Sequence, residues 1–360
     1  MQQYCVVAQD SEMPPETPHS VWTLTDGRPG NLNPARALAR ALEAHGWAPA
    51  EDRTATLRPW AARLPAGVWV ALGAREGGWP FTGLSDRGAG VARPWPDLVI
   101  SAGRRSAPIA AAMRRLSGGA VRAVQILDPG LSPARFDAVV VPEHDRLTGP
   151  NVLRSLGSLS AVTPATAAEA AARETRFTAL PRPRAAVLLG GPSRSARFGE
   201  AEGRAVVAAV RALAEAGWTP LVTPSRRTPA GLAAEIARAV PSASVWDGGA
   251  PNPYPALLGA AELALVTADS ANMASEAASA GLPVLVLDLP GLAPKLRRFH
   301  AALRERRCSR IFRGEPETWE APPLDEAARV GAEVAVRLGG GYTTPRGFGR
   351  WRWGWATRAM

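Results

Sequence analysis

The chain has 360 residues, 46% hydrophobic and 21% charged, an ordinary balance for a globular protein but a length that exceeds one usual core. Its net charge of +10 comes almost wholly from arginine, which favours acidic ligands, and no recognition helix, zinc-ligand spacing or RNA-binding aromatic motif points to nucleic acid. The two cysteines are too few for a disulfide framework and lack metal-ligand spacing, so we expect no metal site and no cofactor. The first segment has no secretory pattern, and no apolar window is long enough to span a membrane. We therefore expect a cytoplasmic protein.

Apolar runs that suit strands alternate with helical patterns in the first half of the chain. The expected strands are residues 21–25, 68–72, 97–101, 121–127 and 137–141. The expected helices are residues 34–45 and 106–116.

The second half repeats this alternation. Its expected strands are residues 185–189, 220–223, 244–246, 263–267 and 284–287. Its expected helices are residues 200–216, 230–239, 270–280 and 294–306. Alternating strands and helices in both halves predict an α/β protein with two doubly wound parallel sheets.

These patterns divide the chain into an N-terminal Rossmann-like domain at 20–174, a C-terminal Rossmann-like domain at 185–322 and a helix at 323–338. The polar, proline-rich stretch 175–184 is the expected linker. Residues 339–360 form a tail rich in arginine and tryptophan, which we expect to be flexible. The same composition also suits peripheral contact with an anionic membrane surface, such as the inner membrane.

Two turns that follow strands of the first half are candidate binding sites. The first contains Asp26, Gly27, Gly30 and Asn33, where glycines allow a tight turn and close approach of a ligand. An ordinary alternative is that Asn33 caps the helix that starts at Pro34. The second turn contains Gly103, Arg104 and Arg105, whose arginines could clamp an acidic group or simply be solvated.

His144 and Asp145 follow the expected strand at 137–141. A histidine at the carboxyl end of a parallel strand is well placed for general base catalysis, and a neighbouring acid can tune or orient it. A histidine satisfied within its loop is the alternative.

Three polar turns end strands of the second half. Because ligands of open α/β sheets bind at the carboxyl edge, we expect these turns to converge on one site. The turn that begins at Thr267 leads into the expected helix at 270–280, whose N-terminus favours phosphate. The candidate binding residues are Gly190, Gly191, Ser193, Ser225, Arg226, Arg227, Thr228, Asp269, Ser270, Asn272, Met273 and Glu276.

These motifs resemble those of the mitochondrial-fission ELM family, whose bacterial members are often described as predicted nucleoside-diphosphate-sugar epimerases. The matching segments are 190–194, 225–229 and 267–277 in the second half and 26–30, 103–105 and 142–145 in the first. The resemblance spans roughly residues 21 to 310. One departure is Pro34, where the family tends to have glutamine, so the contact of that side chain is not expected here.

The resemblance implies a GT-B-like fold, in which two Rossmann-like domains face each other across a cleft. Asp269-Ser270 and Glu276 also have a spacing similar to that of UDP-N-acetylglucosamine 2-epimerases. By that resemblance, Ser270 would bind the pyrophosphate of a nucleotide sugar and Glu276 its ribose. The acceptor would lie near Gly30, Arg104 and Arg105.

The expected function is therefore nucleotide-sugar binding, most simply by a metal-independent glycosyltransferase in which His144 or Asp145 is the catalytic base. Two alternatives stay open: a nucleoside-diphosphate-sugar epimerase, and a non-catalytic adaptor related to mitochondrial-fission factors.

Overall fold

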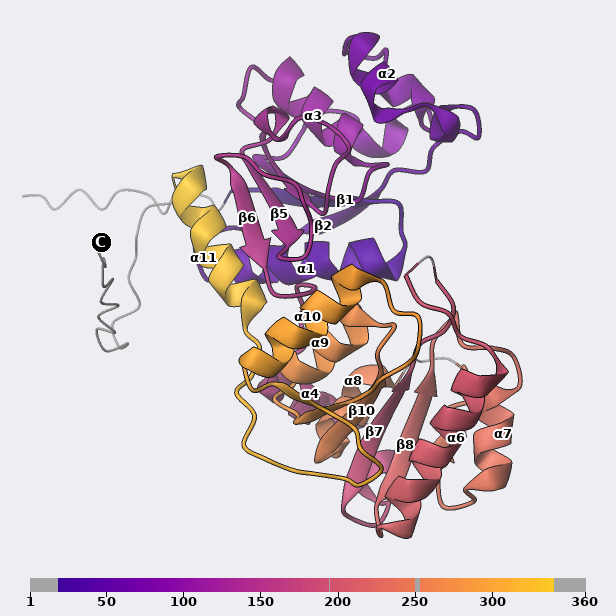
Figure 1. The fold of residues 1–360 in the computed structure, drawn as a ribbon. Coiled ribbons are helices and arrows are strands. Elements are labelled where there is room, and N and C mark those ends of the chain that lie inside the picture. The colour runs from indigo at the N-terminus through magenta and orange to yellow at the C-terminus, as the bar shows by residue number, and fades with distance from the viewer. Residues whose placement is uncertain (1–18, 194, 250–252, 340–360) are drawn as a thin grey trace, which may run out of the picture.

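Two parallel six-stranded sheets, one in each half of the chain, organise the part of the protein that the structure describes (Figure 1). The computed structural model describes residues 19–193, 195–249 and 253–339. The expected tail at 340–360 lies outside these residues. Within them, no helix is both long and apolar enough to cross a membrane.

The N-terminal sheet has the strand order β2-β1-β3-β4-β5-β6, with every neighbouring pair parallel. Its strands are β1 (Val21–Thr25), β2 (Glu51–Thr54), β3 (Leu98–Ala102), β4 (Arg122–Ile126), β5 (Ala138–Pro142) and β6 (Val152–Ser155).

Helices cover both faces of this sheet. Because side chains alternate along a strand, Leu98 and Ile100 of β3 pack toward α1 (Pro29–Glu43), while Val99 packs toward α3 (Ala107–Leu116). Short 3₁₀ turns lie at Ala61–Arg63, Phe81–Gly83, Ala89–Val91 and Pro133–Arg135.

The C-terminal sheet has the order β12-β11-β10-β7-β8-β9, again with parallel neighbours. Its strands are β7 (Arg184–Leu189), β8 (Thr219–Pro224), β9 (Ser244–Val245), β10 (Leu263–Thr267), β11 (Val284–Leu287) and β12 (Ser309–Ile311). Counted along this half of the chain, the order is 3-2-1-4-5-6, the Rossmann order.

Helices cover this sheet on both faces as well. One core holds α6 (Glu200–Glu215) and α7 (Leu232–Ala239). The opposite core holds α4 (Pro164–Arg173), α5 (Thr175–Thr178), α8 (Tyr254–Ala260), α9 (Ala271–Ser279) and α10 (Pro294–Glu305). The predicted GT-B-like architecture of two doubly wound Rossmann-like sheets is confirmed.

The expected strand at 68–72 is wrong, because the segment forms α2 (Ala66–Ala71). Trp69 is buried there against Trp79, with tilted rings whose centroids lie 4.3 Å apart, while Val68 and Leu72 are exposed. The place beside β1 is taken by β2, a largely exposed polar edge strand without an apolar pattern.

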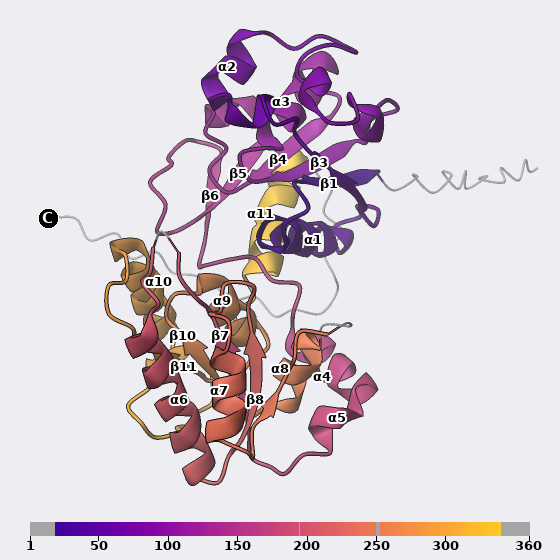
Figure 2. The ribbon, with the colours of Figure 1, turned by 90° about the vertical axis from the view of Figure 1, so that its right-hand side faces the viewer.

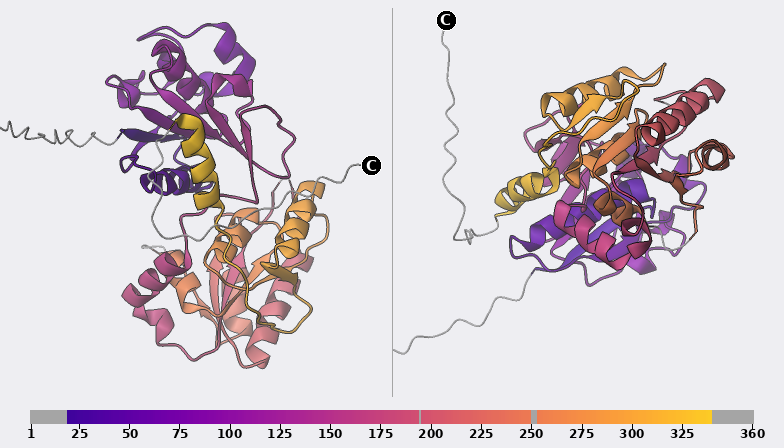
Figure 3. Two further views of the ribbon diagram at one scale, coloured as in Figure 1. Left: turned by 90° about the vertical axis from the view of Figure 1, so that its left-hand side faces the viewer. Right: turned by 90° about the horizontal axis from the view of Figure 1, so that it is seen from below.

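The chain crosses between the sheets twice. Within the segment expected as the linker, α5 buries Phe177 in the C-terminal core, so the first crossing lies at 156–163, before α4. Figure 2 shows α4 and α5 beside α8 in the C-terminal lobe. The helix α11 (Glu326–Leu338) then returns to the N-terminal lobe (Figure 3).

Buried polar contacts fix α11 at the junction of the lobes. The Glu326 carboxylate accepts a hydrogen bond from the Leu156 backbone N–H at 2.8 Å and pairs with Arg329 at 2.6 Å. Gly331 lies so close to α1 that an added Cβ would be 2.8 Å from the Ala41 Cβ. The relative placement of the two lobes therefore rests on specific contacts, which matter for any site between them.

Candidate functional site

A cleft of about 400 Å³ lies between the lobes. It is bounded by the points where strand order reverses in each sheet, between β1 and β3 on one side and between β7 and β10 on the other. Ligands of doubly wound sheets bind at such points. The lining residues from the N-terminal lobe are Gly30, Leu127, Pro142, His144, Asp145, Gly157 and Ser158, and those from the C-terminal lobe are Ser193, Ser195, Arg227, Asp269, Ser270, Ala271, Asn272, Lys295 and Leu296.

Three helices begin at this cleft. The first turns of α1, α9 and α10 supply Gly30, Ala271 and Lys295 to its lining. A Cβ added to Gly30 would be 3.7 Å from the Asn272 Nδ2, so the start of α1 faces the start of α9. Helix N-termini carry partial positive charge and free N–H donors, so this arrangement favours an anion.

Ser270 is the N-cap of α9, and its hydroxyl accepts a hydrogen bond from the Met273 backbone N–H at 3.4 Å. The Met273 side chain packs against the hydrophobic core. Of these two predicted binding residues, Ser270 therefore lines the cleft, whereas Met273 packs against the core.

Asp269 is buried and ties two loops of the C-terminal sheet together. Its side chain is 0% exposed, accepts a hydrogen bond from the Gly191 N–H at 2.8 Å and lies 3.1 Å from the Arg227 guanidinium. A Cβ on Gly190 would be 2.1 Å from the Asp269 carboxylate, and one on Gly191 would be 1.9 Å from the Arg227 carbonyl oxygen. The neighbouring loops therefore fill the space beside both of these candidate binding glycines.

The loop at 225–228 is held by its own side chains. Thr228 Oγ1 accepts a hydrogen bond from the Ser225 N–H at 2.8 Å and donates to the carbonyl oxygen of Leu189 or Gly190. Arg227 donates to the Gly191 carbonyl at 2.7 Å and lines the cleft. Arg226 is exposed and does not line the cleft, so Arg227 is the cation that this loop provides there.

Asn33 and Glu276, predicted on opposite sides of the cleft, meet between the lobes. The Glu276 carboxyl is hydrogen-bonded by Asn33 of α1 and Tyr254 of α8. Asn33 is therefore not an N-cap, because α1 already begins at Pro29, and proline is favoured at a first helical position. Burial raises the pKa of Glu276 to about 7, and the two hydrogen bonds only partly oppose that rise.

We expect Glu276→Gln to change how stability depends on pH. A carboxyl pKa raised from 4.5 to about 7 gives the folded state an advantage below pH 4.5 that is lost as pH rises through 7. The full shift corresponds to roughly 3 kcal/mol, and we expect about 2 kcal/mol because the side chain keeps some solvent contact. The free energy of unfolding of the variant minus that of the wild type should therefore be larger at about pH 8.5 than at about pH 5 by that amount.

Urea denaturation at both pH values measures this difference. Glu235→Gln, on the exposed side of α7, is the matched control and should show no such change. A Glu276→Gln difference that stays constant with pH would contradict the assigned environment.

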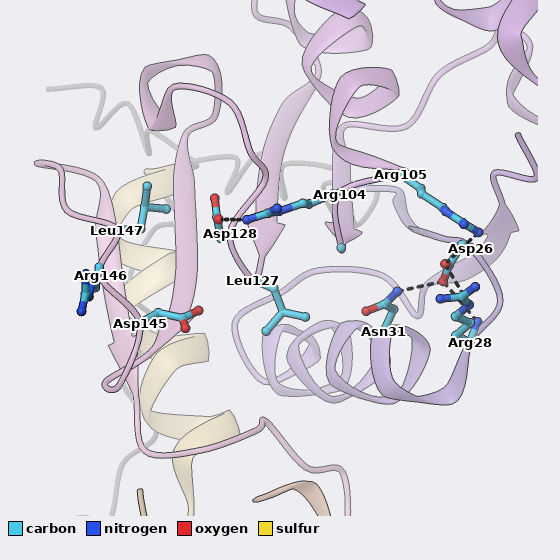
Figure 4. A pocket seen from close by; sticks show the side chains of 11 residues that line it. Asp26, Arg28, Asn31, Arg104, Arg105, Leu127, Asp128, Asp145, Arg146 and Leu147 are labelled. Atoms are coloured by element: carbon cyan, nitrogen blue, oxygen red, sulfur yellow. Dashed lines mark hydrogen bonds and ion pairs between the residues drawn. The ribbon is translucent and has the colours of Figure 1, made fainter. Parts of the chain in front are cut away.

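A second cavity of about 660 Å³ opens in the N-terminal lobe (Figure 4). It shares Leu127 and Asp145 with the cleft, so the two spaces adjoin. Its other lining residues are Asp26, Arg28, Asn31, Gly103, Arg104, Arg105, Asp128, Arg146 and Leu147. The predicted residues Asp26, Gly103, Arg104 and Arg105 thus come together here.

Gly103 lines this second cavity, and Gly27 lies in the turn next to it. Gly103 has a φ of +83°, and a Cβ there would be 2.8 Å from the Asn31 Nδ2. Asn31 in turn donates to the Asp26 carboxylate at 2.8 Å. Gly27 has a φ of +75°, which favours glycine in the turn after β1.

His144 lies at the end of β5, where it lines the cleft beside Asp145. Burial lowers the pKa of His144, Asp145 opposes that change, and Lys295 and Arg298 reinforce it. The ring lies edge-on to Phe299, with centroids 6.3 Å apart, and Arg298 donates to the His144 carbonyl at 3.3 Å. A neutral imidazole next to a carboxylate can accept a proton.

Sequence reasoning missed several residues that line these spaces. Lys295, the only lysine of the sequence, lies in the first turn of α10 and belonged to none of the predicted polar turns. Ser158 follows β6, a strand that the sequence did not predict, and Arg28 and Asn31 lay within a predicted turn without being selected. In the part of the chain described here, no group of three or more histidine, cysteine or acidic side chains is arranged to hold a metal ion.

Comparison with known proteins supports a common origin for most of the chain. Residues 29–338 match the family described as Mitochondrial fission ELM1. The chain is 32% identical over 277 residues to the Arabidopsis thaliana Mitochondrial fission protein ELM1. The aligned region covers 67% of this chain and 65% of the plant protein, so the chain spans slightly under two thirds of that relative. It is 26% identical over 362 residues to the uncharacterized protein RP120 of Rickettsia prowazekii, covering 89% and 98% of the two chains.

Among solved structures, the UDP-GlcNAc 2-epimerase of Neisseria meningitidis bound to UDP-GlcNAc superposes with a TM-score of 0.49 at 12% identity. The alignment covers 88% of this chain and 100% of that one.

Proposed function

Because the chain belongs to the mitochondrial fission ELM1 family and has a GT-B-like architecture, we propose that its cleft binds a nucleotide sugar and transfers the sugar to an acceptor. The observation that carries this proposal is the convergence of three helix N-termini, Arg227 and Lys295 on one cleft beside His144. Fold alone does not define function, so the proposal rests on this site.

The diphosphate would lie against the first turn of α9, where Ser270 and the adjacent N–H groups face the cleft. Arg227 and Lys295, which also line the cleft, would supply positive charge. Together these groups would stabilise the negative charge that develops on a departing nucleoside diphosphate. We also propose that Glu276 meets the ribose, which would require its carboxylate to be shared with Asn33 and Tyr254.

The acceptor would enter from the cavity in the N-terminal lobe. Since Asp145 and Leu127 border both spaces, a hydroxyl group from that cavity can reach the cleft next to His144. Neutral His144 would remove the hydroxyl proton as the sugar is transferred, and Asp145 would stabilise the imidazolium that results.

A thermal-shift screen against UDP-, GDP-, ADP- and CMP-sugars tests donor binding. At 100 times its dissociation constant, a ligand adds about 2.7 kcal/mol of stability, enough to move the melting transition by several degrees. We expect one nucleotide class to do so, and Arg227→Gln to remove most of that shift. Arg226→Gln, an equal loss of charge outside the cleft, is the control and should keep it.

If none of the four classes shifts the transition, donor binding in this cleft is contradicted. If a donor binds, turnover separates the functions: transfer needs an added acceptor, an epimerase acts on the donor alone, and an adaptor shows neither reaction.

A further inference from the structure

The cavity of about 660 Å³ in the N-terminal lobe contains an unusual concentration of arginine. Arg28, Arg104, Arg105 and Arg146 line it, together with three aspartates. These charges come from the loops that follow β1, β3, β4 and β5, so the sheet brings them together from distant parts of the sequence. The cavity has the size of a small-molecule site.

The Asp26 carboxylate does not provide hydrogen-bond acceptors for the guanidinium groups of the two arginines beside it. Its carboxylate is 8% exposed and already accepts hydrogen bonds from the Asn31 side chain at 2.8 Å and the Arg28 N–H at 3.3 Å. The Arg28 and Arg105 guanidinium groups lie 3.5 Å and 3.9 Å from it, as ion pairs without a hydrogen bond. Figure 4 shows both groups converging on this one carboxylate.

Arg28 and Arg105 therefore keep N–H donors for another partner. Their side chains are 62% and 47% exposed, and no hydrogen bond from either guanidinium occurs among the described residues. Arg104 differs, because it is paired and hydrogen-bonded to Asp128. Two guanidinium groups around a single buried carboxylate leave one positive charge uncompensated, and arginine donors match the oxygens of phosphate or carboxylate.

We propose that Arg28 and Arg105 bind an anionic group of the acceptor, so that the acceptor is a hydroxyl-bearing molecule with a phosphate or carboxylate. This inference rests on the proposed function for the acceptor role, but the anion site stands on its own contacts. The anion lies at the Arg28 and Arg105 end of the cavity, and the reacting hydroxyl lies at the Asp145 end, beside His144.

Hydrogen–deuterium exchange tests the site with three small probes that share a glycerol-like skeleton: glycerol 3-phosphate, glycerate and glycerol. We expect one or both anions to slow exchange in the segments 26–31 and 103–106, and neutral glycerol to have no effect. Protection by glycerol 3-phosphate alone assigns a phosphate, and protection by glycerate alone assigns a carboxylate. No protection by either anion would overturn the proposal.

The double variant Arg28→Gln with Arg105→Gln should lower the binding affinity for the anion by at least about tenfold. A single hydrogen bond to a charged group contributes about a factor of ten to affinity. Arg28→Lys with Arg105→Lys should recover part of the affinity by restoring charge without the guanidinium geometry. The matched control is Arg173→Gln with Arg204→Gln, two exposed arginines with comparably loose ion pairs of 3.8 Å and 3.7 Å to Glu169 and Glu200. Equal weakening by the control would also overturn the proposal.

The same variants separate this inference from the proposed function. If the Arg28→Gln with Arg105→Gln variant loses the protection by the anion but keeps the thermal shift with the nucleotide sugar, the anion site and donor binding are both supported. An anion response in a protein that binds no nucleotide sugar would keep the anion site and contradict donor binding.

Discussion

Gly191→Ala is expected to destabilise the protein by about 3 kcal/mol and to abolish nucleotide binding. Its new methyl group would lie 1.9 Å from the Arg227 carbonyl oxygen and 2.9 Å from the Thr228 nitrogen, both backbone atoms that cannot rotate away. The loop at 225–228 would have to move, and with it the hydrogen bond from Arg227 to Gly191 and the ion pair with Asp269. Urea denaturation and the thermal-shift response to the nucleotide sugar measure the two effects.

Gly203→Ala is the matched control for this prediction. Gly203 lies within α6, and the nearest atom to its added methyl group is the Leu232 Cδ1 at 3.7 Å, an ordinary contact. Because alanine is preferred over glycine in helices, this variant should gain about 0.5–1 kcal/mol. Similar stabilities for the two variants would show that the loops do not pack as described.

His144→Ala is expected to lower turnover by about 10² to 10⁴-fold while leaving the thermal shift from the donor unchanged, as loss of a general base does. Because the pKa of His144 is lowered from its usual 6.5, the wild-type rate should stay constant across neutral pH. It should fall only as acid protonates the imidazole, with the acid limb of kcat/KM below pH 6.5.

Asp145→Asn distinguishes the two candidate bases. The negative charge of Asp145 raises the pKa of His144, so its removal should move the acid limb of the rate profile to still lower pH. If Asp145 itself were the base, the substitution would abolish turnover and His144→Ala would be tolerated.

The local sequence signals predicted the strands and helices that carry the site. The expected strand at 263–267 and the expected helix at 270–280 correspond closely to β10 and α9, because each pattern depends on nearby residues. The edge strands β2 and β12 were missed because their residues are polar or few: β2 is largely exposed, and β12 has three residues.

The inner contacts of the site could not be read from sequence. Gly190 and Gly191 were selected correctly as special positions, but the partner that requires them, Asp269, lies 78 residues from Gly191. The meeting of Asn33 with Glu276 depends on how the lobes are placed, which is set by contacts such as those of Glu326 and Gly331. Periodicity describes each element but not which loops of different sheets come together.

The most direct test of a nucleotide-sugar cleft is a crystal structure of the protein with the nucleotide sugar that gives the largest thermal shift. We predict density for the diphosphate at the N-terminus of α9, within hydrogen-bond distance of Ser270 and of backbone N–H groups in the first turn, with Arg227 or Lys295 beside it. Density for the nucleotide at any other place, with this cleft holding only solvent, would contradict the account.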